Sequence, residues 1–312
     1  MTAFILRRLL LVLPVLLGVS ILVFFILHLT PGNPALVVAG PDAPPETIRQ
    51  VERELGLDQP LFVQYTRYLG RILRGDFGRS IRSRDPVLER LIATFPVTLT
   101  LALIGVAFTT SVSIPMGILA AYRRNSALDV ATIFLVLTGS AMPVFAVGLI
   151  LMWVFAVTLG WFPISGYAPL TSAGGWRHII LPAITVSSGT IALLARLTRS
   201  SMLEVLNQDY VRTARAKGVG ERPVVLRHAF RNALLPVVTV IGLQFGFLLS
   251  GAVVTESIFS LPGMGRLLVQ AILGRDFPVV QGAVLLAAVT FVITNLLVDM
   301  VYAAVDPRIR YE

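Results

Sequence analysis

Long apolar runs, separated by short charged loops, constrain the fold of this chain more than any other feature. Several of these runs reach the roughly 20 residues that a helix needs to cross the hydrocarbon core of a bilayer. Hydrophobic residues make up 55% of the 312 residues, whereas charged residues make up 14%. This composition favours an all-α membrane protein that crosses the bilayer several times. Six transmembrane helices are expected, over residues 9–29, 96–122, 130–159, 179–197, 234–257 and 279–305.

Two of the expected spans have features of their own. Arg7 and Arg8 precede the first span, as in a signal peptide. The apolar stretch is too long for such a peptide, however, and residues 30–34 do not form a small-residue cleavage site, so we expect a retained helix. The third span is long enough to tilt in the bilayer or to kink at Pro143, which is a candidate gating residue.

Basic residues gather in one loop between the fourth and fifth spans. Residues 196–232 hold eight of the 26 basic residues of the chain and only three acidic ones. Such an excess in a short loop marks the cytoplasmic side of a membrane protein, and six spans then place both termini in the cytoplasm. Segment 31–95 carries nine arginines and eight acids. We still expect it outside, because long segments do not follow the charge rule.

These assignments divide the chain into three parts. Residues 1–30 form the N-terminal tail and first transmembrane helix, residues 31–95 form an extracytoplasmic segment, and residues 96–312 form a five-helix core that includes the basic loop. Proline, glycine and the spacing of apolar residues predict helices in the extracytoplasmic segment, with Pro45 near a helix start and Gly56 at a helix end. Two interpretations remain open: packing on the bundle or the membrane interface, and docking of an external partner.

Several classes of function are not expected. The net charge of +9 comes from loops that flank the spans, not from one patch with interleaved aromatic residues, so nucleic-acid binding is not expected. The chain has no cysteine and its three histidines lie far apart, so we expect no metal site. The one lysine, Lys217, precedes a glycine instead of following one, so there is no Walker-type phosphate loop. We expect no catalytic residue and no cofactor in this chain.

The centre of the basic loop, DYVRTARAKG at residues 209–218, is expected to form a two-turn helix. Asp209 is a good N-cap residue, and Gly218 can adopt the left-handed conformation that ends a helix. Pro223 suits the first position of a following helix. A helix this short needs a partner surface to be stable. The candidate coupling residues are Asp209, Tyr210, Arg212, Thr213, Ala214, Arg215, Ala216, Lys217 and Gly218.

The composition of this helix suits insertion into a groove of another protein. The small side chains of Thr213, Ala214 and Ala216 let the backbone approach a partner closely, and the neighbouring cations can pair with carboxylates at the rim. From the residues alone, a basic loop that only fixes the membrane topology stays an open alternative.

Several motifs make the chain resemble a known family. The sequence at 209–218, followed by RNALLP at 231–236, resembles the EAA loop of ABC importer permeases in the form typical of the dipeptide, oligopeptide and nickel branch. The resemblance covers essentially the whole chain, through TPGNP at 30–34, LGLDQP at 55–60, GLQFGFLLSGAVVTESIFSLPGMGRLL at 242–268, RDFPVVQ at 275–281 and VDPRIRYE at 305–312. One departure is Arg212-Thr213-Ala214, which stands where the broad family has Glu-Ala-Ala, so no salt bridge of that glutamate is transferred.

The resemblance implies one subunit of an ATP-driven importer. It implies the type I ABC importer permease architecture in the bacterial inner (plasma) membrane, with the EAA helix in a cleft of a cytoplasmic ATPase. The implied partners are a second permease, two cytoplasmic ATPase subunits or domains, and an extracytoplasmic substrate-binding protein. ATP and magnesium are then bound by the ATPases, whose closure swings the permease helices between inward-facing and outward-facing states.

Translocation of short peptides is the expected function, and this substrate class rests on the resemblance. A glutathione importer and a nickel-complex importer stay open, as does a secondary transporter without ATPases, although we find no inverted repeat to support the last. The candidate pathway or gating residues are Pro143, Ser187, Ser188, Gln244 and Glu256. Hydroxyl and amide side chains also serve helix packing, and a carboxylate near the interface can make a structural pair, so a structural role is the alternative for them.

Overall fold

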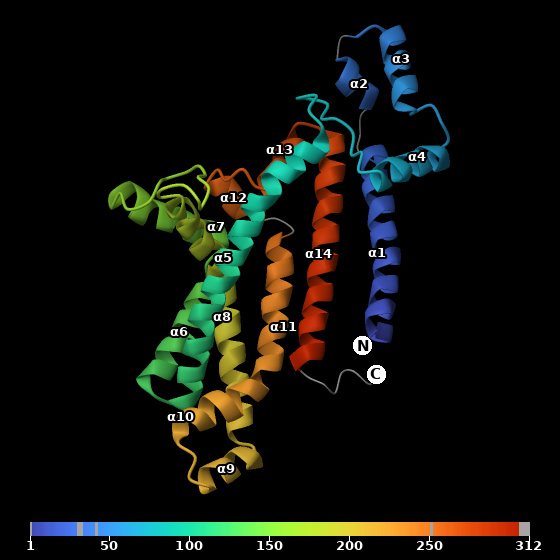
Figure 1. Cartoon of the computed structure of the whole chain (residues 1–312). Coiled ribbons are helices and arrows are strands. Elements are labelled where there is room, and N and C mark those ends of the chain that lie inside the picture. Colours follow the sequence, from blue (N-terminus) through green and yellow to red (C-terminus); the bar gives the residue numbers. More distant parts are fainter. Residues whose placement is uncertain (1, 30–33, 41–42, 250–251, 306–312) are drawn as a thin grey trace.

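Helices form every named element in the part of the chain that the structure describes. The structure is a computed structural model that describes residues 2–29, 34–40, 43–249 and 252–305. Long helices run side by side, and shorter helices lie at both ends of the bundle (Figure 1). The expected cytoplasmic C-terminal tail with its VDPRIRYE motif lies almost wholly outside the described residues, as does most of the 30–34 motif.

Four helical stretches among the described residues are long and apolar enough to cross a membrane. They belong to α5 (Val87–Tyr122), α8 (Trp176–Leu206), the stretch Glu221–Leu249 that ends in α11 (Phe230–Leu249), and α14 (Phe277–Val305). α1 (Thr2–Leu29) covers the first expected span, and its described apolar part is Leu10–Phe25. The prediction of an all-α membrane protein is confirmed. The count of six spans and the cytoplasmic termini stay predictions.

The third expected span is not one helix. α6 (Ala127–Ala141) ends before Met142, which has an extended backbone (φ −88°, ψ 128°), and α7 (Val144–Leu151) begins after Pro143. A proline disfavours the helical conformation in the residue before it, so the sequence breaks the helix here. α7 then continues as the π-helix η1 (Met152–Thr158). The prediction of one helix kinked at Pro143 is therefore wrong, because Pro143 separates two helices.

The fifth expected span ends earlier than predicted. α11 ends at Leu249, and α12 (Val253–Ile258) is a separate helix that leads to α13 (Met264–Leu273). Both short helices lie at the upper end of the bundle in Figure 1. Glu256, expected at the end of the fifth span, thus lies on a short helix of its own.

The two longest helices, α5 and α8, form the most extensive helix pair among the described residues. Gly117 on α5 allows this close approach, because a Cβ atom there would lie 2.5 Å from the Cβ of Thr198 and 2.7 Å from the carbonyl oxygen of Ala195. Close backbone contact through small residues is typical of helices in membranes. α6, α7 and α11 pack on α8, so α8 is the centre of the bundle.

Large apolar side chains are exposed on the outer faces of the long helices. Leu13 of α1 is 63% exposed, Phe134 of α6 67% and Phe247 of α11 68%. A water-soluble protein rarely exposes so much contiguous apolar surface. These faces fit contact with lipid. Because lipid would cover the outer side of each long helix and other helices cover the inner side, the spans are apolar all round instead of on one stripe.

Residues 34–86 contain a small helical module at the upper end of α1 (Figure 1). It comprises α2 (Pro34–Ala39), α3 (Pro45–Leu55) and α4 (Leu61–Leu73). As expected, Pro45 is the first residue of α3, and Gly56 follows that helix in the left-handed conformation (φ +68°). α1 begins and α14 ends toward the opposite end of the bundle, the end that carries α9.

Candidate coupling site

The basic loop forms a hairpin of short helices at the lower end of the bundle in Figure 1. α9 (Asp209–Ala216) leads to α10 (Glu221–Pro223), and the π-helix η2 (Val224–Ala229) then continues into α11. The predicted two-turn helix is confirmed, and η2 was not predicted. Two basic residues assigned to this loop, Arg196 and Arg199, instead lie on α8, which is longer than expected. The next helix begins at Glu221, so Pro223 is its third residue and not its first.

A buried apolar cluster joins η2 and α11 to the ends of α5 and α8 beneath the hairpin. Its buried members are Ala121, Met202, Val225, Ala229 and Ala233. Val211 is the buried residue of α9, with 0% exposure. Complete burial of an aliphatic side chain of this size stabilises a fold by roughly 1.5–3 kcal/mol. The hairpin is therefore attached to the ends of the long helices and is not a loose loop.

Gly218 ends α9 in a Schellman motif. Its φ is +76°. The N–H of Gly218 donates to the carbonyl oxygen of Arg215 (2.9 Å), and the N–H of Val219 donates to that of Ala214 (3.2 Å). Glycine adopts this backbone conformation without the steric cost of a side chain. The predicted left-handed end of the helix is confirmed.

The start of α9 differs from the prediction in one detail. Gln208 occupies the N-cap position without a side-chain cap hydrogen bond, and Asp209, which was expected there, is the first helical residue. Its carboxylate still lies in the first turn, where a negative charge is favourable. The Tyr210 hydroxyl accepts a hydrogen bond from Nδ2 of Asn232 (2.7 Å), which ties α9 to the first turn of α11.

An ion pair closes the turn after α9. Arg215 donates to both carboxylate oxygens of Glu221, at 2.7 and 3.2 Å. The side chains are 40% and 39% exposed, so solvent limits the pair to less than about 1 kcal/mol. The hydrogen bond from Arg215 holds the pKa of the Glu221 carboxyl below its ordinary value, and Glu221 therefore stays ionised at neutral pH.

The surface of α9 is open to a partner. Every residue from Asp209 to Gly218 is exposed except Val211 and the half-buried Ala214. Arg212 makes one long contact with Asp209, at 3.7 Å between highly exposed side chains. Within the described ranges, no group of three or more His, Cys, Asp or Glu side chains is placed to hold a metal ion. The arrangement offers a narrow helix flanked by cations, which suits contact and not catalysis.

A buried ion pair that the sequence did not reveal lies between α6 and α8. Arg199 donates two hydrogen bonds to the carboxylate of Asp129, at 2.6 and 2.8 Å. The same carboxylate accepts the N–H of Asn125 at 3.0 Å, and Asp129 is 2% exposed. The pair fixes the turn between α5 and α6 on α8. Arg199 was counted only as a topology signal, because its partner lies 70 residues away in the sequence.

The candidate pathway serines make hydrogen bonds within the bundle. Ser187 is fully buried, and its hydroxyl lies 2.8 Å from the carbonyl oxygen of Gly105 on α5 and 2.7 Å from a carbonyl of its own helix. The Ser188 hydroxyl, which is half-buried, bonds to its own helix at 2.8 Å. Gln244 is half-buried on α11. The geometry of Ser187 is that of a packing contact, and a pathway role for these residues stays a prediction.

Glu256 is fully buried and caps the start of α13. Its Oε1 accepts the hydroxyl of Thr98 at 2.7 Å, and its Oε2 accepts the N–H of Arg266 at 3.0 Å. The Thr98 hydroxyl oxygen accepts the N–H of Met264 at 2.8 Å. These acceptors satisfy N–H groups that a helix start leaves without partners. A Cβ atom on Gly263 would lie 2.3 Å from the carboxyl carbon, so this cap leaves room for glycine alone. A gating role for Glu256 stays a prediction.

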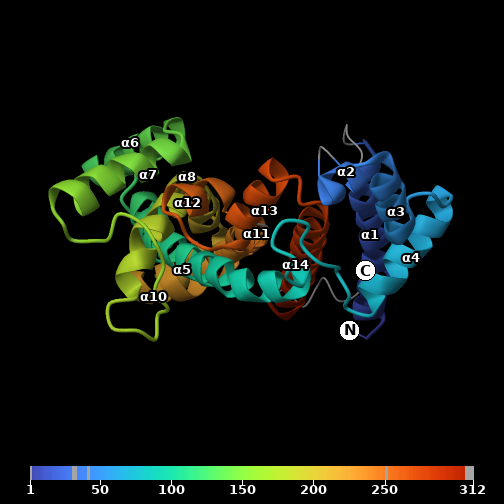
Figure 2. The same cartoon turned by 90° about the horizontal axis from the view of Figure 1, so that it is seen from above.

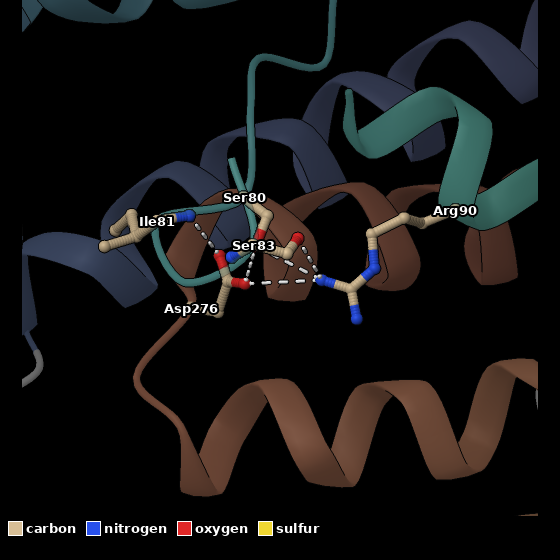
Figure 3. Close-up of polar contacts among 5 residues, drawn as sticks. All are labelled: Ser80, Ile81, Ser83, Arg90 and Asp276. Carbon is tan, nitrogen blue, oxygen red and sulfur yellow. Dashed lines mark hydrogen bonds and ion pairs between the residues drawn. The ribbon is translucent and has the colours of Figure 1, made fainter. Parts of the chain in front are cut away.

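A second buried carboxylate, Asp276, lies at the turn between α13 and α14 (Figure 3). It accepts the hydroxyl of Ser80 and the N–H of Ile81 (3.0 Å), and the guanidinium of Arg90 lies 3.6 Å away. The loop between α4 and α5 is thereby fixed to the start of α14. Asp276 belongs to the motif at 275–281, but no pattern within that motif indicates partners about 195 residues distant.

Two family descriptions match this chain. "Binding-protein-dependent transport system inner membrane component" matches residues 113–311, and "Binding-prot-dependent transport system membrane comp, N-term" matches residues 1–102. A solved structure of an inward-facing MetNI methionine ABC transporter is similar over 69% of this chain and 96% of its own, with a TM-score of 0.55 and 17% sequence identity. At that identity the likeness shows a shared fold.

Relatives match over the full length of both chains. The glutathione transport system permease protein GsiC of Salmonella paratyphi A is 48% identical over 312 residues, which are 100% of each chain. A Brucella abortus protein named "Putative peptide transport system permease protein" is 50% identical over 314 residues, again 100% of each chain. The family match covers more than half of the chain. The chain therefore belongs to the binding-protein-dependent transport system inner membrane component family, the permease subunits of ABC importers.

Proposed function

We propose that this permease forms part of the translocation path for short peptides, and that α9 is the helix through which a cytoplasmic ATPase drives it. The observation that carries the proposal is the construction of the α9 hairpin. The surface of α9 is exposed, and α9 contacts η2, whose Val225 and Ala229 are buried in one cluster with Ala121 of α5 and Met202 of α8. A push on the exposed helix therefore reaches the long helices through η2.

The full assembly contains a second permease, two cytoplasmic ATPase subunits or domains and an extracytoplasmic substrate-binding protein. Membership in a binding-protein-dependent family supports the last of these. ATP and magnesium belong to the ATPase subunits in this proposal, and this chain contributes coupling and pathway but no catalytic group. The cations Arg212 and Lys217, which are exposed beside the small residues of α9, meet carboxylates at the rim of the ATPase cleft.

Two substrates of similar chemistry are supported by the relatives. One relative is named for peptide transport and another for glutathione transport, and glutathione is itself a tripeptide. We favour short peptides and keep glutathione as the second candidate. The complete complex in proteoliposomes, supplied with its binding protein, separates them: labelled dipeptide and labelled glutathione are offered in competition. Uptake of neither, or uptake by this chain without ATPase subunits, contradicts the proposal.

The substitution Ala216→Trp tests docking of α9. Ala216 is exposed, so the large side chain leaves folding and membrane insertion unchanged but blocks entry into a groove. We expect transport and substrate-stimulated ATPase activity of the reconstituted complex to fall at least about tenfold, the effect of about 1.4 kcal/mol in coupling. Ala93→Trp is the matched control, because Ala93 is exposed on α5 near the opposite end of the bundle. Equal effects of the two variants would refute the assignment.

A further inference from the structure

Helix α4 lies across the upper end of α1 (Figures 1 and 2). Its inner face packs on α1: the rings of Tyr65 and Tyr68 lie 5.5 and 5.8 Å from the ring of Phe24. Two more apolar side chains, Phe62 and Leu73, are 77% and 78% exposed. An amphipathic helix with this orientation and uncovered apolar residues is typical of the membrane interface.

Three arginines lie on α4 or directly after its last residue, Leu73. Arg67, Arg71 and Arg74 follow one another at helical spacing and border a cavity of about 530 Å³. No described carboxylate lies within ion-pair distance of any of them. Phe24 and Tyr68 border the same cavity. The cavity thus combines an apolar wall with guanidinium groups that have no anionic partner among the described residues.

Tyr68 adds a polar group that lacks a partner. Its side chain is 6% exposed, and its hydroxyl has no hydrogen-bond partner among the described residues. Buried hydroxyl groups are normally satisfied. Burial raises the pKa of Tyr68 to about 12, so the hydroxyl stays protonated and can donate a hydrogen bond. Tyr68 and Arg71 also border a neighbouring cavity of about 880 Å³. Tyr68, whose hydroxyl has no described partner, and the three arginines therefore border the same cavity.

We propose that this cavity binds the headgroup of an anionic phospholipid. Its phosphate pairs with Arg67, Arg71 and Arg74 and accepts a hydrogen bond from the Tyr68 hydroxyl. Guanidinium groups bind phosphate oxygens through paired, charge-assisted hydrogen bonds, which matches the residues at the cavity.

The position of the cavity identifies the phosphate as that of a lipid. Phe24 lies in the last two turns of α1 (Thr2–Leu29), so the cavity lies beside the outer end of the first expected span, close to the boundary between acyl chains and headgroups. The exposed side chains of Phe62 and Leu73 can enter the same boundary layer. A soluble phosphate could pair with the arginines, but it would gain no binding free energy from the apolar side chains around them.

Lipid retention by the purified transporter complex tests the proposal. The complex is incubated with phosphatidylglycerol or with phosphatidylcholine of the same acyl chains, and bound lipid is counted by native mass spectrometry. We expect phosphatidylglycerol to bind about tenfold more tightly, and Arg71→Gln/Arg74→Gln to remove that preference. Tyr68→Phe deletes only the hydroxyl and should weaken retention about threefold. Arg49→Gln/Arg53→Gln on α3 makes the same charge change away from this cavity and should have no effect.

Four results overturn the proposal. Equal retention of the two lipids by the unmodified complex shows that no headgroup site exists, and an equal loss in the α3 control shows a general charge effect. Inorganic phosphate that competes as well as the lipid shows a site for a soluble anion. If Arg71→Gln/Arg74→Gln keeps the lipid preference but weakens capture of the binding protein in phosphatidylcholine nanodiscs, the arginines serve a protein contact. Normal ATPase activity of the variants verifies that they are folded.

Discussion

The upper end of the bundle and the α9 hairpin use carboxylates in opposite ways. At the upper end in Figure 1, Glu256 and Asp276 are 0% and 2% exposed and accept hydrogen bonds from segments distant in the sequence. In the α9 hairpin, the Glu221 side chain is 39% exposed and pairs with Arg215, six residues away. The buried acids join separate helices into a frame. The exposed pair only shapes a turn and leaves the surface around it available for contact.

This difference has an energetic basis. A buried carboxylate and its donors have no water to replace a lost partner, so each contact depends on the others. An exposed pair exchanges its partner for water at little cost. We infer that the upper end keeps its geometry while the hairpin accepts a partner, and the predictions below test this contrast.

The largest effect is expected for Glu256→Ala. The change leaves the N–H of Arg266 and the hydroxyl of Thr98 without their acceptor in a buried site. We expect a loss of at least about 3 kcal/mol in the free energy of unfolding, because each buried group left unsatisfied costs about 1–3 kcal/mol. Glu221→Ala in the hairpin should cost less than about 1 kcal/mol. Thermal unfolding of the purified complex measures both.

A conservative variant separates the cap from the mere loss of volume. Glu256→Gln keeps the size of the side chain but presents an NH₂ group to one of the two donors. Its unfolding temperature should lie between those of the unmodified protein and Glu256→Ala. Equal destabilisation by the Glu256 and Glu221 alanine variants would remove the contrast between the two ends.

Much of the fold follows from patterns within single segments. Hydropathy located α5, α8, α11 and α14, and glycine chemistry located the ends of α3 and α9 at Gly56 and Gly218. The break at Pro143 was also present in the sequence, but the unbroken apolar run of residues 130–159 suggested one long helix with a kink. Hydropathy does not report backbone geometry, and for that reason the split into α6 and α7 and the early end of α11 were missed.

The candidate site was predictable where it is local and not where it depends on tertiary contacts. The residues of α9 and its exposed small face could be read from ten consecutive positions. Val211, the buried residue of α9, was not singled out, because its burial depends on packing that the sequence of α9 does not reveal. The side-chain partners of Asp129, Glu256 and Asp276 lie 70 to 196 residues away, and a single sequence holds no record of such pairings.

An intermediate effect is expected for Gly218→Ala. The left-handed backbone (φ +76°) costs an alanine about 1 kcal/mol, which destabilises the end of α9 without any clash, since no atom lies within 4 Å of the added carbon. Transport per ATP hydrolysed should fall while expression stays normal. Gly160→Ala carries the same kind of strain (φ +65°) after η1, again with nothing within 4 Å. Coupling losses of equal size in the two variants would show that strain alone, and not its place in the hairpin, matters.

The smallest effect is a pH dependence of the hairpin. Because Arg215 lowers the pKa of Glu221 in the folded protein, their pair stabilises the turn above the ordinary pKa of glutamate, about 4.3, and this contribution is lost as the pH falls through the folded value. Amide hydrogen exchange of α9, corrected for its intrinsic pH dependence, should be constant from neutral pH to about pH 5 and accelerate less than about fivefold at more acidic pH. Glu221→Gln should show the faster exchange at every pH. Protection that instead decreases as the pH rises would mean that another group controls the hairpin, and a change much larger than fivefold would mean that the pair is as buried as the carboxylates at the opposite end.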